Sequence, residues 1–146
     1  MNSPVTLNRL LVFARDPVPG RVKTRLIPAL GVAGATDVYR QMLQDTLATA
    51  ARADGARCEL WIDGADRGSA TVALARDLGM SIHTQQGADI GARMFAALGE
   101  ALGRAQCAVL IGTDCPEFDK PYIEAAFRTL QTHDAVLGPA ADGGYV

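Results

Sequence analysis

The sequence lacks the excess of positive charge with which proteins gather nucleic acid. Its 146 residues include 14 Lys and Arg against 16 Asp and Glu, which gives a formal net charge of -2. A chain with this balance has no global positive field to displace the counterions around a phosphate backbone. We therefore expect no nucleic-acid partner, and any site for an anion must be local.

Cysteine and histidine are scarce as well. The three cysteines, Cys58, Cys107 and Cys115, include no C-x-x-C pair, and the two histidines lie far from them in the sequence. This odd count and this spacing argue against both a disulfide framework and a structural zinc site.

Long apolar runs are missing too. A helix needs about 20 consecutive apolar residues to cross a bilayer, and no stretch approaches that length. Residues 1–14, MNSPVTLNRLLVFA, also lack the basic leader and the long apolar core of a signal peptide. We expect no membrane partner and a cytoplasmic location.

The sequence does contain an alternation of short apolar runs and longer segments with helical periodicity, which is typical of an α/β fold with a parallel sheet. Each run is too short and too continuous for an amphipathic helix. The predicted strands are Arg9–Ala14, Arg57–Ile62, Met80–Thr84, Ala108–Gly112 and Asp134–Gly138. No repeat or linker divides them, so we expect one domain over residues 1–146.

Three apolar stripes with three-and-four spacing predict helices that lie on this sheet. They run from Tyr39 to Ala50, from Ile90 to Ala101, and from Ile123 to Leu130 after a proline suited to a first helical turn. Residues 143–146 resemble the beginning of a further strand, yet the sequence stops there. We therefore expect a domain that is truncated at its C-terminus.

The first predicted strand leads into ARDPVPGRVKTRL, residues 14–26, where basic side chains lie close together. The basic residues are Arg15, Arg21, Lys23 and Arg25. Prolines and Gly20 favour a turn here, and parallel sheets place ligands at the carboxyl ends of their strands. We interpret the segment as a phosphate-binding loop, in which Arg supplies a planar fork and Lys a compact charge, and we predict that Arg25 is also a catalytic residue. Its spacing fits neither a Walker A loop nor a GxGxxG turn, and the alternative is a solvated basic loop.

A second candidate lies in CAVLIGTDCPEF, where the strand predicted at residues 108–112 delivers Asp114 at its carboxyl end. An acid there, opposite the basic loop, is where Mg²⁺ or Mn²⁺ would bridge carboxylate and phosphate oxygens. We predict that Asp114 is a metal ligand and a catalytic residue; the alternative is a helix cap or turn former. Cys115 has no nucleophile motif around it, which favours a structural thiol.

Two further segments carry candidates. Asp142 precedes two glycines in GPAADGGYV, and we predict a second catalytic carboxylate there, with a tight turn as the alternative. In QQGADIGARM, residues 85–94, a loop flanked by glycine leads into a predicted helix. Free N–H groups and an amide side chain can meet a base or sugar there, so we predict that Gln86 and Gly87 bind the nucleotide.

Four motifs occur in order along the chain: FARDPVPGRVKTRL, QGADIGARM, LIGTDCP and LGPAADGGY. Together they resemble the bacterial family of domain of unknown function 2064 (DUF2064). That family is described as glycosyltransferase-like, is linked to arsenosugar biosynthesis and belongs to the nucleotide-diphospho-sugar transferase superfamily. The resemblance covers nearly the whole chain. It implies a GT-A-like three-layer α/β/α sandwich with a mostly parallel, Rossmann-like sheet, whose nucleotide-binding half precedes an acceptor-binding half.

By the same resemblance, Arg15, Lys23 and Arg25 correspond to the phosphate-binding loop of nucleotidyltransferases. The T-R-L ending of that loop is kept here, whereas its glycine-rich part is replaced by proline. Asp114 corresponds to the superfamily's metal-binding aspartate, although the usual D-x-D is reduced to T-D-C. Family members continue beyond D-G-G-Y, which again predicts that part of the acceptor site is missing.

Two reactions use such a site. In a sugar transferase an acceptor hydroxyl attacks the anomeric carbon and a nucleoside diphosphate departs; in a nucleotidyltransferase a phosphate attacks the α-phosphorus and pyrophosphate departs. The T-R-L segment favours the second reaction and the family context favours the first. We prefer transfer from a nucleotide-diphospho-sugar to a small-molecule acceptor, with a nucleotide-binding module without turnover as a third hypothesis. The base, the sugar, the acceptor and the oligomeric state stay open.

Overall fold

The computed structural model describes residues 8–64 and 68–145, over which strands and helices alternate. The strands are β1 (Asn8–Arg15), β2 (Arg57–Asp63), β3 (Ser81–Thr84) and β4 (Cys107–Ile111). The helices are α1 (Ile27–Ala51), α2 (Ala70–Asp77), α3 (Ile90–Leu102) and α4 (Lys120–Thr129). A 3-10 turn, η1 (Thr24–Leu26), precedes α1.

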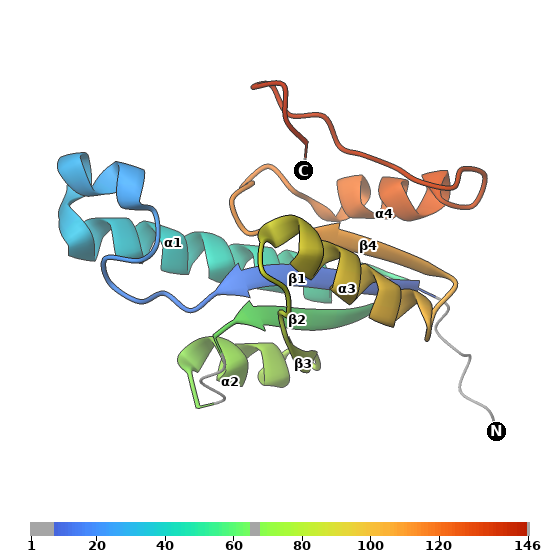
Figure 1. Cartoon of the computed structure of the whole chain (residues 1–146), viewed down its shortest axis with the longest axis horizontal. Helices are drawn as coiled ribbons and strands as arrows, with labels where there is room; N and C mark the ends of the chain where they lie inside the picture. Colours follow the sequence, from blue (N-terminus) through green and yellow to red (C-terminus); the bar gives the residue numbers. More distant parts are fainter. Residues whose placement is uncertain (1–7, 65–67, 146) are drawn as a thin grey trace.

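The strands form a parallel sheet in the order β3-β2-β1-β4 (Figure 1). Strand β2 pairs with β1, and β3 then pairs with β2. The chain next crosses back, and β4 pairs with the other side of β1. As a result β1 has a neighbour on each side, with Arg15 opposite Asp63 of β2 and Val12 opposite Ile111 of β4. The strand order reverses between β1 and β4, and open parallel sheets bind ligands beyond the strand ends at such a point.

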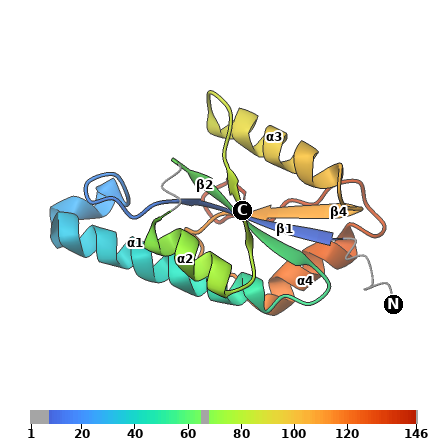
Figure 2. The same ribbon diagram turned by 90° about the horizontal axis from the view of Figure 1, so that it is seen from below.

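Helices cover both faces of the sheet and give three layers (Figure 2). Helices α1, α2 and α4 lie on one face, and α3 lies on the other. Side chains of β1 alternate between the faces, as a pleated strand requires. Leu10 and Val12 belong to the core under α1, whereas Leu11 and Phe13 pack with Ala97 of α3. The predicted α/β/α sandwich with a Rossmann-like parallel sheet is confirmed.

Three of the helices begin at a side chain that caps them. Ser69, Asp89 and Asp119 each accept a hydrogen bond from the backbone N–H three residues further on. Each cap satisfies an N–H group that has no partner inside its helix. Helix α1 instead has a proline in its first turn, and Gly31, with a φ of 74°, interrupts its helical geometry.

Four predicted strands are present with ends that shift by at most one residue, and the three predicted helices are present as well. The short helix α2 was not predicted. The strand predicted at Asp134–Gly138 is wrong, because these residues form no ladder and Leu137 is 71% exposed. An apolar run becomes a strand only when a neighbour pairs with it, and no described strand lies beside this one. At residues 143–145, where a further strand was expected to begin, Tyr145 forms an isolated antiparallel bridge with Pro139; Val146 lies outside the described residues.

The three cysteines are free and partly buried. Burial raises the pKa of the Cys58 thiol to about 11, and its Sγ donates to the carbonyl of Ala50 at 2.8 Å. Cys115 packs against the core under α1. Over residues 8–64 and 68–145, no helix combines the length and the apolar character that crossing a bilayer demands. The sequence predicts no leader in residues 1–14, and residues 1–7 of this segment lie outside the residues that the structure describes.

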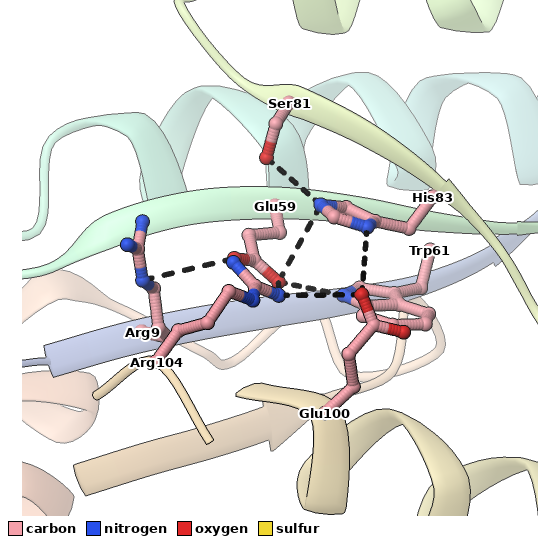
Figure 3. Close-up of polar contacts among 7 residues, drawn as sticks. All are labelled: Arg9, Glu59, Trp61, Ser81, His83, Glu100 and Arg104. Atoms are coloured by element: carbon pink, nitrogen blue, oxygen red, sulfur yellow. Dashed lines mark hydrogen bonds and ion pairs between the residues drawn. The ribbon is translucent and has the colours of Figure 1, made fainter. Parts of the chain in front are cut away.

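Strand β2 carries a glutamate into the core under α3 (Figure 3). Glu59 is fully buried. Arg104 donates to its Oε1 at 2.8 Å and Trp61 Nε1 donates to its Oε2 at 2.9 Å, while Arg9 and His83 lie 3.8 and 3.7 Å away. Burial alone would raise the pKa of Glu59, but the hydrogen bonds from Arg104 and Trp61 outweigh it and hold this pKa below its usual value. This Glu59 cluster fastens the C-terminal end of α3 to the sheet.

Candidate functional site

A cavity of about 950 Å³ opens where the strand order reverses, beyond the carboxyl ends of β1 and β4. Its wall comes from the loop after β1, the residues after β4, the end of β2 and the loop that leads into α3. Among the described residues, five cations and three carboxylates line it. They are Arg15, Arg21, Lys23, Arg25 and Arg93, and Asp63, Asp89 and Asp114. The structure therefore gathers the basic segment and Asp114 around one space.

The basic loop, residues 16–23, is anchored by one buried side chain. Val22 is 4% exposed and packs in the core under α1, whereas the neighbouring Arg21 is exposed. The N–H of Val18 donates to the carbonyl of Asp16 at 2.7 Å, which closes the turn that the prolines predict. Because the apolar anchor faces inward, the basic side chains on either side of it are left at the cavity.

Lys23 has the left-handed backbone conformation that favours glycine. Its φ of 48° and ψ of 42° make it the one non-glycine residue with positive φ over residues 8–64 and 68–145. That conformation costs a lysine roughly 1–2 kcal/mol. The strained backbone carries the side chain toward β4, where Nζ lies 3.0 Å from Oδ1 of Asp114. A strained backbone conformation persists only where the surrounding structure enforces it, and such conformations are common at functional sites.

Asp114 follows β4 and is mostly accessible from the cavity. Its side chain is 73% exposed, whereas that of Lys23 is 22% exposed. The described part of the chain contains no group of three or more His, Cys, Asp or Glu side chains that could hold a metal by themselves. Mg²⁺ commonly binds through one or two carboxylates together with substrate phosphates and water. The donor set therefore fits a cation whose other oxygen ligands come from the substrate and from water.

The opposite wall holds an ion-paired carboxylate that the sequence analysis missed. Asp63 ends β2, and its two oxygens lie 2.9 Å from Nη1 of Arg93 and 3.7 Å from Nε of Arg15. Arg93 comes from the first turn of α3 and also donates from Nε to the carbonyl of Gly87 at 3.0 Å. Asp63 directly follows a predicted strand, so the rule that found Asp114 would also have found it. This rule could not predict Arg93, because Arg93 lies within a predicted helix and not directly after a strand.

Gln85, and not Gln86, lines the cavity. Its Nε2 donates to the carbonyl oxygens of Ala14 at 3.2 Å and Trp61 at 2.9 Å, so the amide ties β1 to β2 at their carboxyl ends. Gln86 is exposed, and neither it nor Gly87 is among the lining residues. Gly87 has a φ of 146°, and a Cβ there would lie 2.8 Å from the backbone nitrogen of Arg93. It thus shapes the loop that presents Arg93.

Asp142 lies in a turn and is not among the residues that line the cavity. Its Oδ1 accepts a hydrogen bond from the N–H of Gly144 at 2.9 Å. The turn closes through backbone bonds from Ala140 N to the Gly144 carbonyl and from Gly143 N to the Ala140 carbonyl. The tight turn was the alternative for this segment, and the catalytic role of Asp142 stays a prediction.

The family model described as "Uncharacterized protein conserved in bacteria (DUF2064)" matches residues 46–146. The chain belongs to this family, as its four ordered motifs predict. No curated protein sequence matches it.

Solved structures share the fold. A protein from Desulfovibrio desulfuricans G20, described as a "putative nucleotide-diphospho-sugar transferase", is 34% identical over 94% of this chain, with a TM-score of 0.83. The chain spans 60% of the length of that protein. A CMP:2-keto-3-deoxy-manno-octonic acid synthetase, solved in complex with CTP, is 14% identical, with a TM-score of 0.55 over 89% of this chain and 49% of its own. This second likeness shows the fold alone.

Proposed function

We propose that the chain is the donor-binding part of a glycosyltransferase that uses a nucleotide-diphospho-sugar. The observation that carries the proposal is the cavity at the strand reversal, where Lys23 meets Asp114 at 3.0 Å and Arg15 and Arg25 line the same space. The 34% identity to the Desulfovibrio protein described as a nucleotide-diphospho-sugar transferase supports it. Because the chain spans 60% of that protein, the proposal concerns donor binding and the departure of the nucleoside diphosphate.

In this proposal Arg15, Lys23 and Arg25 hold the diphosphate. Among the described residues around the cavity five cations outnumber three carboxylates, which favours an anionic ligand. Guanidinium groups hold phosphate oxygens in pairs, and the lysine ammonium supplies a compact charge. Gln86 and Gly87 stay predicted contacts to the base or sugar, although neither lines the cavity.

We propose that Asp114 binds Mg²⁺ or Mn²⁺ together with oxygens of the diphosphate. A bound cation of this kind stabilises negative charge on the departing phosphate. Asp114 is suited to this role because its side chain is 73% exposed, which leaves its oxygens accessible from the cavity. Asp142 stays the predicted second carboxylate.

The transfer needs charge stabilisation more than acid–base chemistry from these residues. The acceptor's hydroxyl oxygen attacks the anomeric carbon and gives its proton to a carboxylate base, for which Asp142 is the predicted residue. The bond from that carbon to the diphosphate oxygen breaks, and its electron pair leaves with the nucleoside diphosphate. Arg15, Lys23 and Arg25 line the cavity, and in this proposal they lie beside the oxygens on which this charge grows. Fixed cations beside a developing anion stabilise it without reorganising at the moment of reaction.

Nucleotidyl transfer is the second candidate, because the T-R-L segment forms η1 and places Thr24, Arg25 and Leu26 along the cavity wall. A phosphate on the second substrate would attack the α-phosphorus of a nucleoside triphosphate, and pyrophosphate would leave. The same cations serve both reactions, so the leaving group distinguishes them.

Product analysis tests the proposal. Purified chain is screened by thermal shift against nucleotides and nucleotide sugars with and without Mg²⁺, and the best ligands are then incubated with candidate small-molecule acceptors. We expect stabilisation by nucleotide sugars and release of a nucleoside diphosphate. Pyrophosphate release from a triphosphate would establish the second candidate, and binding without turnover would indicate a binding module. No stabilisation by any nucleotide would contradict all three.

A cytoplasmic location belongs to the same proposal. Fractionation of cells that express the tagged chain checks it: we expect the chain in the cytosolic fraction, and recovery in the membrane or secreted fraction would contradict it.

A further inference from the structure

The hydroxyl of Tyr39 lies where β1 and β4 part. The pairing of these strands ends at Val12 and Ile111, whereas β1 continues to Arg15. Tyr39, which is 5% exposed, reaches from α1 to this point. Its O–H donates to the carbonyl of Arg15 at 2.9 Å, and its oxygen accepts from the N–H of Arg15 at 2.8 Å. One side chain thus satisfies the backbone donor and acceptor of the residue that begins the basic segment.

Thr113 lines the same cavity after β4, and hydrogen bonding from its side chain acts to lower the pKa of the Tyr39 hydroxyl. Thr113 is 5% exposed and directly precedes Asp114. A phenol has one donor and two acceptor positions, so the two bonds to Arg15 leave one acceptor position for Thr113. Burial raises the pKa of Tyr39, and the hydroxyl is a protonated donor at neutral pH.

We propose that Tyr39 is a positioning residue that sets the gap between Arg15 and Asp114, and so the width that the cavity offers to a diphosphate. The two halves of the site lie on different strands, and beyond Val12 no ladder between β1 and β4 fixes their separation. Tyr39 supplies that connection from a third element, α1. The inference rests on the proposed function for the identity of the ligand, whereas the hydrogen bonds belong to the chain itself.

The test is Tyr39→Phe, which removes the hydroxyl and leaves the ring. Nucleoside diphosphate affinity is measured by titration calorimetry with Mg²⁺, using whichever of UDP, GDP, CDP and ADP binds the wild-type chain. We expect affinity to fall about tenfold, because Arg15 and Thr113 lose the partner that holds them. Hydrogen exchange should increase at the Arg15 amide and stay unchanged in α3.

A matched control separates positioning from stability. Ile123→Val removes one methylene group from the same core, and Ile123 is not among the residues that line the cavity. It should lower the Tm by a similar amount and keep wild-type affinity. Thr113→Val should give a smaller loss of affinity than Tyr39→Phe, and Thr113→Ser, which keeps a hydroxyl, should restore it. The threonine pair also serves as the test where Tyr39→Phe does not fold.

Two outcomes overturn the inference and differ in what else they overturn. If the wild-type chain binds a nucleoside diphosphate and Tyr39→Phe binds it equally well, Tyr39 is not a positioning residue and the proposed function stands. If the wild-type chain binds no nucleotide, the positioning role of Tyr39 and the proposed function are both contradicted.

Discussion

Two carboxylates on the same sheet have opposite surroundings. Glu59 lies within β2, is fully buried and has Arg104 and Trp61 as hydrogen-bond donors. Asp114 lies beyond the end of β4, has a side chain that is 73% exposed, and has one ion-pair partner, Lys23, among the described residues. The protein supplies several hydrogen-bond and ion-pair partners to Glu59, whereas Asp114 faces an open cavity.

The difference separates charges that hold the fold from charges that are available to a ligand. A buried carboxylate must find its partners within the protein, since no water replaces them. Exposed charges around a cavity are solvated, so they contribute little to stability and gain most when an ion of opposite sign enters. We therefore expect variants in the Glu59 cluster to change stability, and variants around the cavity to change binding.

The largest expected effect on binding comes from Asp114→Asn. Removing the charge should abolish the Mg²⁺-dependent part of nucleotide binding, because Mg²⁺ at such sites is held through one or two charged carboxylates and the amide is neutral. Stability should change by less than about 1 kcal/mol, since the ion pair is exposed. Calorimetric titration with and without Mg²⁺ measures the first effect and thermal unfolding the second. Asp37→Asn, at another exposed ion pair, is the control; overlapping titration curves for the two variants would rule out the metal site.

The largest expected effect on stability comes from Arg104→Met. Glu59 then stays buried without its strongest donor, and breaking a buried pair in this way costs about 3 kcal/mol. Urea unfolding measures the loss. Arg40→Met makes the same change at the exposed pair with Asp37 and should cost less than about 1 kcal/mol. Equal losses in the two variants would remove the distinction between the two carboxylates.

The Glu59 cluster also predicts an acid dependence. The pKa of Glu59 is lowered in the folded chain, so its stabilisation is present above the unfolded value of about 4.3 and is lost as the pH falls through the folded value. Unfolding free energy measured between neutral pH and pH 3 should fall less steeply in Arg104→Met than in the wild type. Parallel curves would show that Arg104 does not set this pKa.

A smaller effect on binding is expected from Arg25→Ala. Loss of one charged hydrogen bond should weaken nucleotide binding by about 1.5–3 kcal/mol. Stability should stay unchanged, because Arg25 is exposed. Arg40→Ala, on the outer side of α1, should leave the titration as in the wild type. Wild-type affinity in Arg25→Ala would remove this residue from the phosphate site.

The smallest effect is expected from Lys23→Met, and its sign depends on the ligand. Without nucleotide, Mg²⁺ or Mn²⁺ should bind Asp114 more tightly by up to about 1 kcal/mol, because the competing ammonium is gone. Nucleotide affinity should fall, because the same ammonium contacts phosphate in our proposal. Manganese paramagnetic resonance measures the first change and calorimetry the second. Changes of the same sign would contradict a shared role for Lys23.

The sequence predicted the sheet because short segments rich in apolar residues alternate along it with segments of helical periodicity. The run at residues 134–138 has the same composition, yet Leu137 is exposed because no described strand pairs with it. The apolar composition of a segment indicates that it can be buried in a sheet. It becomes a buried strand only where a neighbouring strand pairs with it. Glu59 was missed for a related reason: its main donor, Arg104, lies 45 residues away, and no local pattern shows that distance.

The site was predictable to the extent that it follows strand ends. Asp114 and the basic segment were found in this way, and Asp63 obeys the same rule. Gln86 was predicted from its place in the loop and its role stays a prediction, whereas Gln85, directly after β3, turns its amide toward Ala14. Tyr39 was predicted only as part of an apolar helix face, since its hydroxyl acts at a strand 24 residues earlier.

The position of β1 divides the cavity wall into a fixed part and an adaptable part. Arg15 pairs with Asp63 of β2, and the hydroxyl of Tyr39 holds both its backbone N–H and its carbonyl, so its position is fixed. The loop that follows is fastened mainly at Val22 and is otherwise on the surface. Under the proposed function, exchanging residues on either side of that anchor should change which anion the chain prefers while the scaffold folds as before, and this loop would then be the place to engineer donor selectivity.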